Sequence, residues 1–151
     1  MNPSPDTAPC SGATLGLLFR QLRDAMWARM ADELAARGHE LTFSQYITLK
    51  KLAGGTASVT DLARAAELNP GAMTRLLDRL ETKGLLARVA DPDDRRGINI
   101  HLTAAGLLIW QDINQCGMRV RERAMQGMSE VDRDQLTQLL NRVRDNLSPE
   151  E

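Results

Sequence analysis

Residues 69–103 read NPGAMTRLLDRLETKGLLARVADPDDRRGINIHLT, and their pattern predicts a helix followed by a β-hairpin. Asn69 and Pro70 predict the start of a helix, because asparagine is a favoured N-cap and proline costs nothing at the first helical position. We expect this helix to run to Lys83, since apolar residues recur every three or four positions and Gly84 follows. The residues expected on its buried face are Met73, Leu76, Leu77 and Leu80.

A β-hairpin is predicted directly after this helix. Residues 85–90 and 98–103 have the length of short strands, and the second of them, INIHLT, alternates apolar and polar side chains. Between them lies the loop DPDDRRG, at 91–97, whose proline and glycine favour a turn. The hairpin would therefore carry arginines at its tip.

Two further helices are predicted upstream. Thr42 caps the first of them, and Gln45 follows three residues later in a capping-box pattern. The second is short and ends near Ala66, with either Ser58 or Thr60 as its N-cap. Three helices followed by a hairpin is the element order of a winged helix-turn-helix, which we predict for this middle region.

Long amphipathic helices are predicted on both sides of this region. One spans about 14–37 and ends at Gly38. After the hairpin, Thr103 caps a helix that reaches about Met128, and Ser129 caps a last one. Nothing else in the chain is large enough to cover the apolar stripes of these helices.

The bulk composition is that of an ordinary globular protein and gives no strong sign of a nucleic-acid partner. The chain has 151 residues, of which 42% are hydrophobic and 26% charged, and its net charge is -1. Residues 42–102 carry nine lysines and arginines against seven acidic residues, a balance of only +2. A prediction of DNA binding must therefore rest on the motif and on the local placement of charge.

The sequence shows no sign of export or of a membrane span. It lacks a basic segment followed by an apolar run at its start, and its uncharged stretches are too short to cross a bilayer. Its two cysteines, Cys10 and Cys116, lie far apart and do not form a disulfide framework. We expect a cytoplasmic protein with no membrane contact, no metal and no cofactor.

The exposed face of the predicted recognition helix has the chemistry to read DNA. Gly71 would let the backbone approach closely, and Arg75 could bond a guanine edge or hold a phosphate. Arg79 is a weaker candidate, because Asp78 and Glu81 lie near it. A solvated charged face is the simpler interpretation of any one arginine, but the order of the elements favours DNA contact.

The predicted hairpin tip adds a second contact region. Arginines suit a narrow minor groove, and a neighbouring aspartate can orient an arginine by a bidentate pair. Serines and threonines near helix starts can both cap a helix and contact a phosphate. The full set of predicted DNA contacts is Ser44, Ser58, Thr60, Asn69, Pro70, Gly71, Thr74, Arg75, Arg79, Asp94, Arg95 and Arg96.

Residues 41–106 resemble the MarR family of bacterial regulators. The most specific segments are the wing, DDRRGINIHLT, and the recognition helix, NPGAMTRLLDRLETKGL. The family's wing pattern is an Asp, one residue, an Arg and a short strand ending in Leu-Thr, which falls here on Asp94, Arg96, Leu102 and Thr103. The flanking helices match the family's layout by length and position.

This resemblance implies a homodimeric transcriptional regulator, more often a repressor, bound to a palindromic site in double-stranded DNA. The predicted fold class is mainly α with a small β-hairpin wing, flanked by long dimerisation helices. One MarR-type domain would comprise a flexible tail at 1–11, a dimerisation helix at 12–40, the winged helix-turn-helix at 41–103 and C-terminal dimerisation helices at 104–151. Two-fold symmetry predicts half-sites about 10–10.5 bp apart.

The resemblance also implies a small-molecule effector, often an aromatic one in this family. Met26, Trp27, Met30 and Trp110 are the candidate pocket residues. A Met and aromatic stripe at helical spacing is, however, more often core than pocket.

Three other functions compete with this interpretation. A redox-switched regulator would use Cys10 or Cys116, although Cys116 looks more like a small buried hydrophobic residue. A winged helix can also serve as a protein–protein interaction module. An enzyme is disfavoured, because the sequence holds no nucleophile–base set, phosphate loop or metal motif.

Overall fold

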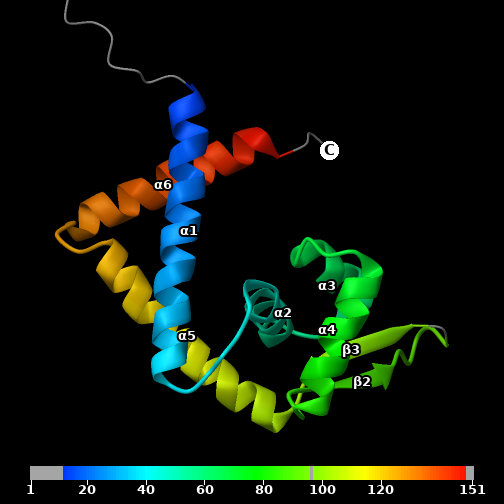
Figure 1. Cartoon of the computed structure of the whole chain (residues 1–151). Coiled ribbons are helices and arrows are strands. Elements are labelled where there is room, and N and C mark those ends of the chain that lie inside the picture. Colours follow the sequence, from blue (N-terminus) through cyan, green and yellow to red (C-terminus); the bar gives the residue numbers. More distant parts are fainter. Residues whose placement is uncertain (1–11, 96, 149–151) are drawn as a thin grey trace, which may run out of the picture.

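A computed structural model describes residues 12–95 and 97–148 of the chain (Figure 1). The predicted tail at 1–11 lies outside the described residues. The helices and three short strands follow one another along the chain in the order α1 Gly12–Ala36, α2 Phe43–Ala53, β1 Ala57–Ser58, α3 Val59–Ala65, α4 Pro70–Thr82, β2 Leu86–Ala90, β3 Ile98–Leu102, α5 Ala104–Ala124 and α6 Glu130–Leu147. The mainly helical fold with a small sheet was predicted and is confirmed.

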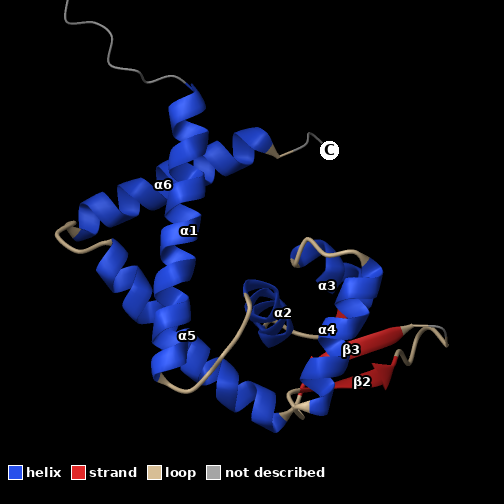
Figure 2. Cartoon of the chain, in the orientation of Figure 1, coloured by secondary structure: helices blue, strands red, loops and turns tan. Residues whose placement is uncertain are grey.

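The elements fall into two regions. The winged lobe consists of α2, α3, α4 and the three strands, and the helical frame consists of α1, α5 and α6 (Figure 2). Helix α1 packs along α5, and α2 lies between the frame and the rest of the lobe (Figure 1). Among the described residues, no helix combines the length and the apolar character needed to cross a membrane.

The winged lobe has a continuous apolar core, to which every lobe helix and the sheet contribute. The predicted buried face of α4 is confirmed, since Met73, Leu77 and Leu80 are fully buried and Leu76 nearly so. The other completely buried side chains of the lobe include Leu49, Leu62 and Ile100. Burial of each such side chain contributes about 1.5–3 kcal/mol, so this core fixes the orientation of α4.

Helix starts in the lobe follow the predicted caps. Thr42 forms a complete capping box with Gln45 at α2, and the Asn69 carboxamide accepts a hydrogen bond from the Ala72 amide at α4. At α3 the sequence left Ser58 and Thr60 as alternatives, and Ser58 is the N-cap. These hydrogen bonds satisfy backbone amides that a helix cannot bond within itself.

The sheet has one strand more than predicted. Strand β1 pairs antiparallel with β3 through Ala57 and Ser58, which gives the strand order β1-β3-β2. Two residues are too few to show the alternation by which a strand is recognised in a sequence. The predicted hairpin is confirmed, with Leu86 opposite Leu102 and Ala90 opposite Ile98.

The junction between the hairpin and α5 depends on Thr103 and Gly106. The Thr103 amide donates a hydrogen bond to the Leu85 carbonyl at 3.1 Å, and its hydroxyl donates to the Gly84 carbonyl. A Cβ on Gly106 would overlap the Leu85 carbonyl oxygen. The strand therefore enters α5 through a backbone approach that only glycine permits.

The predicted end of α5 near Met128 is wrong by four residues. The helix stops at Ala124, and a turn with Gly127 in the left-handed region (φ 82°) separates it from α6. The Arg133 guanidinium, from α6, donates hydrogen bonds to the carbonyls of Met125 and Met128. A side chain from the next helix thus satisfies the carbonyls of this turn, which the periodicity of α5 alone could not indicate.

The helical frame buries far less apolar surface than the lobe. Of the α1 residues whose burial is described, 14–36, Met30 and Leu34 are buried, whereas Leu15, Leu18 and Leu22 are 48–49% exposed. Helix α6 contains no buried residue. The apolar stripes predicted on these helices are therefore present but uncovered within one chain.

Candidate DNA-binding interface

The solvent face of α4 carries the predicted contact residues Gly71, Thr74, Arg75 and Arg79, all of them exposed. The first turn of the helix is rigidly held, because Asn69 caps it and the Thr74 hydroxyl donates a hydrogen bond to the Pro70 carbonyl at 2.9 Å. This arrangement leaves the two arginines on one open surface, whereas the Ala72 and Met73 amides are already bonded to Asn69.

A shallow hollow joins the N-terminal end of α2 to the middle of α4. Ser44, Arg75 and Arg79, which the sequence singled out separately, all line it. Its remaining lining residues are Thr42, Gln45, Leu68, Ala72 and Leu76. The hydroxyl of Ser44 and the two guanidinium groups therefore share one surface, which suits contact with a run of phosphates.

The acidic residues beside Arg79 do not bind it. Asp78 and Glu81 instead hold Arg88 of β2, at 2.8 Å and 2.9 Å between side-chain nitrogen and oxygen atoms. The pKa of Arg88 is raised, chiefly by its hydrogen bond to Asp78. Within the described part of the chain, the side chains of Arg75 and Arg79 have no hydrogen bond or ion pair to another side chain.

Sequence reasoning did not single out Arg88. The available signal was its position: it stands two residues after Leu86 in the strand LARVA, on the side of the strand where an apolar residue is expected. An arginine at such a position needs an oppositely charged partner, and α4 provides the carboxylates of Asp78 and Glu81.

The wing loop is folded by hydrogen bonds of its own. The Asp91 amide donates to the Gly97 carbonyl at 2.9 Å, and the Gly97 amide donates to the Asp94 carbonyl at 3.0 Å. Arg95 is exposed at the tip beside Asp94. Arg96, and with it the predicted aspartate–arginine pair, lies outside the described residues.

Ser58 and Thr60 occupy the start of α3. The Ser58 hydroxyl accepts a hydrogen bond from the Asp61 amide at 3.1 Å, and Thr60 is exposed one residue into the helix. Ser58 therefore has a capping role, and phosphate contact by either residue stays a prediction.

A separate apolar hollow of about 320 Å³ lies between α1, α2 and α5. Met26, Trp27 and Met30 line it, as do two aromatic residues that the sequence did not point to, Phe43 and Tyr46. The Trp27 ring lies 5.2 Å from the Phe43 ring and 5.4 Å from the Tyr46 ring, measured between centroids.

Basic side chains also line this apolar hollow. One of the four candidate pocket residues does not line it. The basic residues are Arg23, Lys50 and Arg121, with the Lys50 ammonium 6.0 Å from the centre of the Tyr46 ring. Trp110 does not line the hollow; this side chain is half-buried and packs against the core. The structure therefore brings three of the four candidate pocket residues together.

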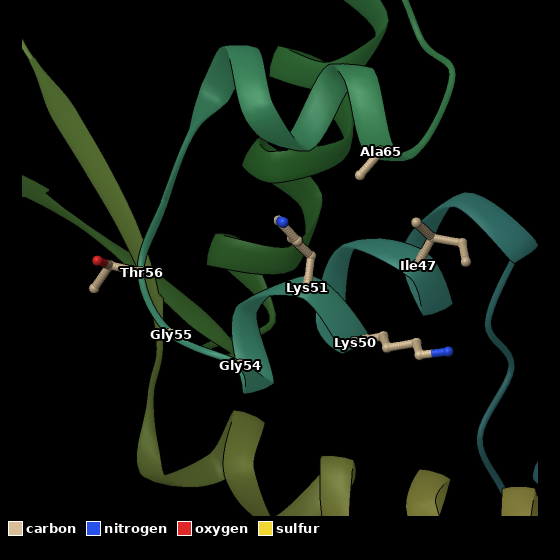
Figure 3. A pocket seen from close by; sticks show the side chains of 7 residues that line it. All are labelled: Ile47, Lys50, Lys51, Gly54, Gly55, Thr56 and Ala65. Carbon is tan, nitrogen blue, oxygen red and sulfur yellow. The ribbon is translucent and has the colours of Figure 1, made fainter. Parts of the chain in front are cut away.

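A further hollow lies at the C-terminal end of α2 (Figure 3). Ile47 and Ala65 lie on one side of it and Thr56 on the other; the Lys51 side chain projects from α2 between them, and the Lys50 side chain points away from the Gly54–Gly55 turn. None of the predicted DNA contacts lines it. It is therefore not part of the candidate interface.

The described residues show neither a reactive cysteine nor a metal-binding cluster. Cys116 is buried in α5, and burial raises the pKa of its thiol, which disfavours the reactive thiolate at neutral pH. Cys10 lies outside the described residues. Within residues 12–95 and 97–148 no group of three or more His, Cys, Asp or Glu side chains could hold a metal ion.

Residues 41–98 match the model of the MarR family. The multiple antibiotic resistance protein MarR of Salmonella typhimurium is 32% identical over 77 residues, which cover 50% of this chain and 54% of that protein. The transcriptional repressor MdtR of Bacillus subtilis is 31% identical over 101 residues, or 66% of this chain and 61% of the relative. The chain thus spans about half the length of the curated relatives it matches first.

The structural match extends over more of the chain. The crystal structure of the transcriptional regulator PA3341 superposes with a TM-score of 0.76 at 30% identity, and the match covers 88% of this chain and 97% of that structure. It therefore includes the frame helices as well as the winged lobe. The chain belongs to the MarR family, whose members are transcriptional regulators and not enzymes.

Proposed function

We propose that this protein is a transcriptional repressor, acting in the cytoplasm, that binds a palindromic operator as a homodimer. The observation that carries the proposal is the solvent face of α4, where Arg75 and Arg79 stay available while a buried apolar face anchors the helix. A helix of this kind fits the major groove, and the hairpin beside it can reach an adjacent minor groove.

Selection of bound sequences from a random duplex library tests DNA binding directly. We expect a palindrome with half-sites about 10–10.5 bp apart, since a two-fold dimer offers two equivalent helices. Arg75→Ala should relax the preference at one base position in each half-site, with a loss of about 1–3 kcal/mol. An equal loss on every sequence would make Arg75 a phosphate clamp, and absence of any selected site would refute the proposal.

The second copy in this proposal covers the apolar stripes of the frame. Leu139 and Leu140 of α6 and Leu15 of α1 are 42–51% exposed in one chain, which is costly for large apolar side chains repeated along two helices. Sedimentation equilibrium of the full chain should give twice the monomer mass. A monomer at micromolar concentration would contradict this part of the proposal.

We further propose that an aromatic anion is the effector and that it binds in the hollow between α1, α2 and α5. Aromatic rings at Trp27, Phe43 and Tyr46, which contact one another edge-on or tilted, lie in this hollow together with the basic side chains Arg23 and Lys50. Aromatic walls suit a ring, and the cations suit a carboxylate. The site touches both regions of the molecule, so a ligand there can favour one spacing of the two DNA-reading helices over another.

Trp27 provides the readout for this site. In the variant Trp110→Phe, Trp27 is the sole tryptophan of the chain, and added hydroxybenzoate should quench its fluorescence at the concentration that releases the operator. Trp27→Phe, with Trp110 retained, is the matched control and should show no such quenching. Release of DNA without quenching of Trp27 would exclude this hollow as the effector site.

The competing functions have clear tests. A redox switch through Cys116 requires that peroxide abolish DNA binding and that Cys116→Ser prevent this loss, although the buried thiol argues against it. A protein–protein module would bind a protein partner independently of salt and would show no affinity for DNA.

A further inference from the structure

Arg88 joins the wing to the recognition helix through one forked contact. It stands in the edge strand β2, opposite the fully buried Ile100 of β3, and its side chain is directed to α4. One terminal nitrogen lies 2.8 Å from an Asp78 oxygen, and the other lies 2.9 Å from a Glu81 oxygen. The Arg88 side chain is 27% exposed, although Asp78 is 61% exposed, so this contact is less screened than the Arg64–Asp61 pair on the lobe surface, whose side chains are 79% and 53% exposed.

A second arginine, Arg75, lies near Asp78 in the sequence but does not form an ion pair with it. Arg75 precedes Asp78 by three residues on α4, the spacing at which oppositely charged side chains meet on a helix. In the described structure the Asp78 carboxylate is bonded to Arg88, and Arg75 has no ion pair. The planar guanidinium of Arg88 can serve two carboxylates at once, which a lysine ammonium does less well.

We propose that Arg88 is a positioning residue for DNA recognition: by binding Asp78 it prevents this carboxylate from pairing with Arg75. Arg75 then meets a base or phosphate without first breaking an intramolecular ion pair. Arg88 also offsets negative charge on the face that approaches the phosphates. This inference rests on the proposed function, since it assigns to Arg88 the availability of the residue that we propose reads DNA.

The test is a set of variants of the full chain measured against the operator selected by the wild type. Arg88→Gln should lower affinity about tenfold and relax preference at the base position assigned to Arg75. Arg88→Gln with Asp78→Asn should recover most of that loss, because the competing carboxylate is gone. In an Arg75→Ala background, Arg88→Gln should have less than about a threefold further effect, since the residue it acts through is absent.

A purely structural role for Arg88 would give the opposite pattern. If Arg88 only ties β2 to α4, Asp78→Asn would not rescue Arg88→Gln, and the loss would persist in the Arg75→Ala background. Either result overturns the inference, as does full affinity in Arg88→Gln. If Arg88→Gln does not fold, as judged by its melting curve, Arg88→Lys replaces it and should show a smaller loss with the same rescue and the same dependence on Arg75.

Two control variants test whether the effect is specific to the contact between Arg88 and Asp78. Arg119→Gln removes the same charge and breaks an ion pair of 3.0 Å to Glu33, but between α5 and α1, and it should leave base preference unchanged. Asp78→Asn alone should keep or slightly raise affinity; a tenfold loss would mean that Asp78 itself contacts a base, which overturns the inference. If the wild type selects no operator, the proposed function is refuted. If it does select one, the Arg88 variants are measured on that operator, and their failure would refute only the role of Arg88.

Discussion

Leucine side chains are buried in the winged lobe and exposed in helix α6 of the helical frame. In the lobe, Leu49, Leu62 and Leu77 are completely buried, whereas Leu139, Leu140 and Leu147 of α6 are 42–78% exposed. All six are leucines on helices, so the sequence gives them the same apolar character. The lobe therefore completes its core within one chain, while the frame presents an apolar surface that only another molecule can cover.

Truncation of a lobe leucine should have the largest effect on stability. Leu77→Ala removes a fully buried side chain and should lower the free energy of unfolding by about 2–5 kcal/mol, because it leaves a cavity in a packed core. Urea denaturation at fixed protein concentration measures the change. Val89→Ala, at a 47% exposed position of the same lobe and outside the frame, is the control and should change stability by only about 0.5 kcal/mol. Equal losses in the two variants would abolish the contrast.

A charge on the frame should break the dimer and leave the lobe folded. Leu139→Glu places a carboxylate within the apolar stripe of α6 and should raise the dimer dissociation constant at least about 30-fold, or about 2 kcal/mol. Sedimentation at several concentrations measures it, and circular dichroism should still show a helical chain. Gln138→Glu adds the same charge next to the stripe and should have little effect. A dimer unaffected by Leu139→Glu would show that α6 is not covered by the second copy.

Gly106 links the two regions and should tolerate no side chain. Gly106→Ala forces a methyl group onto the Leu85 carbonyl and should cost about 1–3 kcal/mol, measured as a lower midpoint of thermal unfolding. Gly117→Ala is the control in the same helix, because its Cβ would have only a distant arginine side chain nearby, and it should raise stability by up to about 1 kcal/mol. Loss of stability in both variants would point to helix α5 as a whole and not to the junction.

The smallest expected effect is on the salt dependence of operator affinity. Arg79→Ala should weaken operator binding on all sequences and reduce the slope of log affinity against log salt by about one, since one phosphate contact is lost. Lys51→Ala, at the other end of α2, should leave the slope unchanged. A change of base preference in Arg79→Ala would instead give this residue a reading role.

Much of the lobe could be predicted because its signals are local. The caps at Thr42 and Asn69 act over three residues, and the buried face of α4 follows from its spacing alone. The same spacing predicted apolar stripes on α1 and α6 but could not say that one chain leaves them uncovered. Strand β1 was missed because it becomes a strand only by pairing with β3, some forty residues later.

The candidate sites divide in the same way. The sequence identified Arg75 and Arg79 from their position on a predicted helix, but not the Arg88 fork that takes up Asp78 and Glu81. It also grouped Trp110 with Trp27, whereas Phe43 and Tyr46 are the aromatic residues in contact with Trp27. Which arginine a carboxylate binds depends on distances across the fold, and these are not encoded in spacing along a helix.

Local signals in the sequence were enough to predict where α2 and α4 begin, which face of α4 is apolar and which of its residues face outward, because caps and periodicity operate within four residues of the chain. Only the tertiary structure decided that Arg88 binds Asp78, that aromatic rings from α1 and α2 form one hollow, and that α6 has no cover within the chain. Those outcomes depend on packing between segments that are distant in sequence, where the choice of partner is set by the shape of the whole fold.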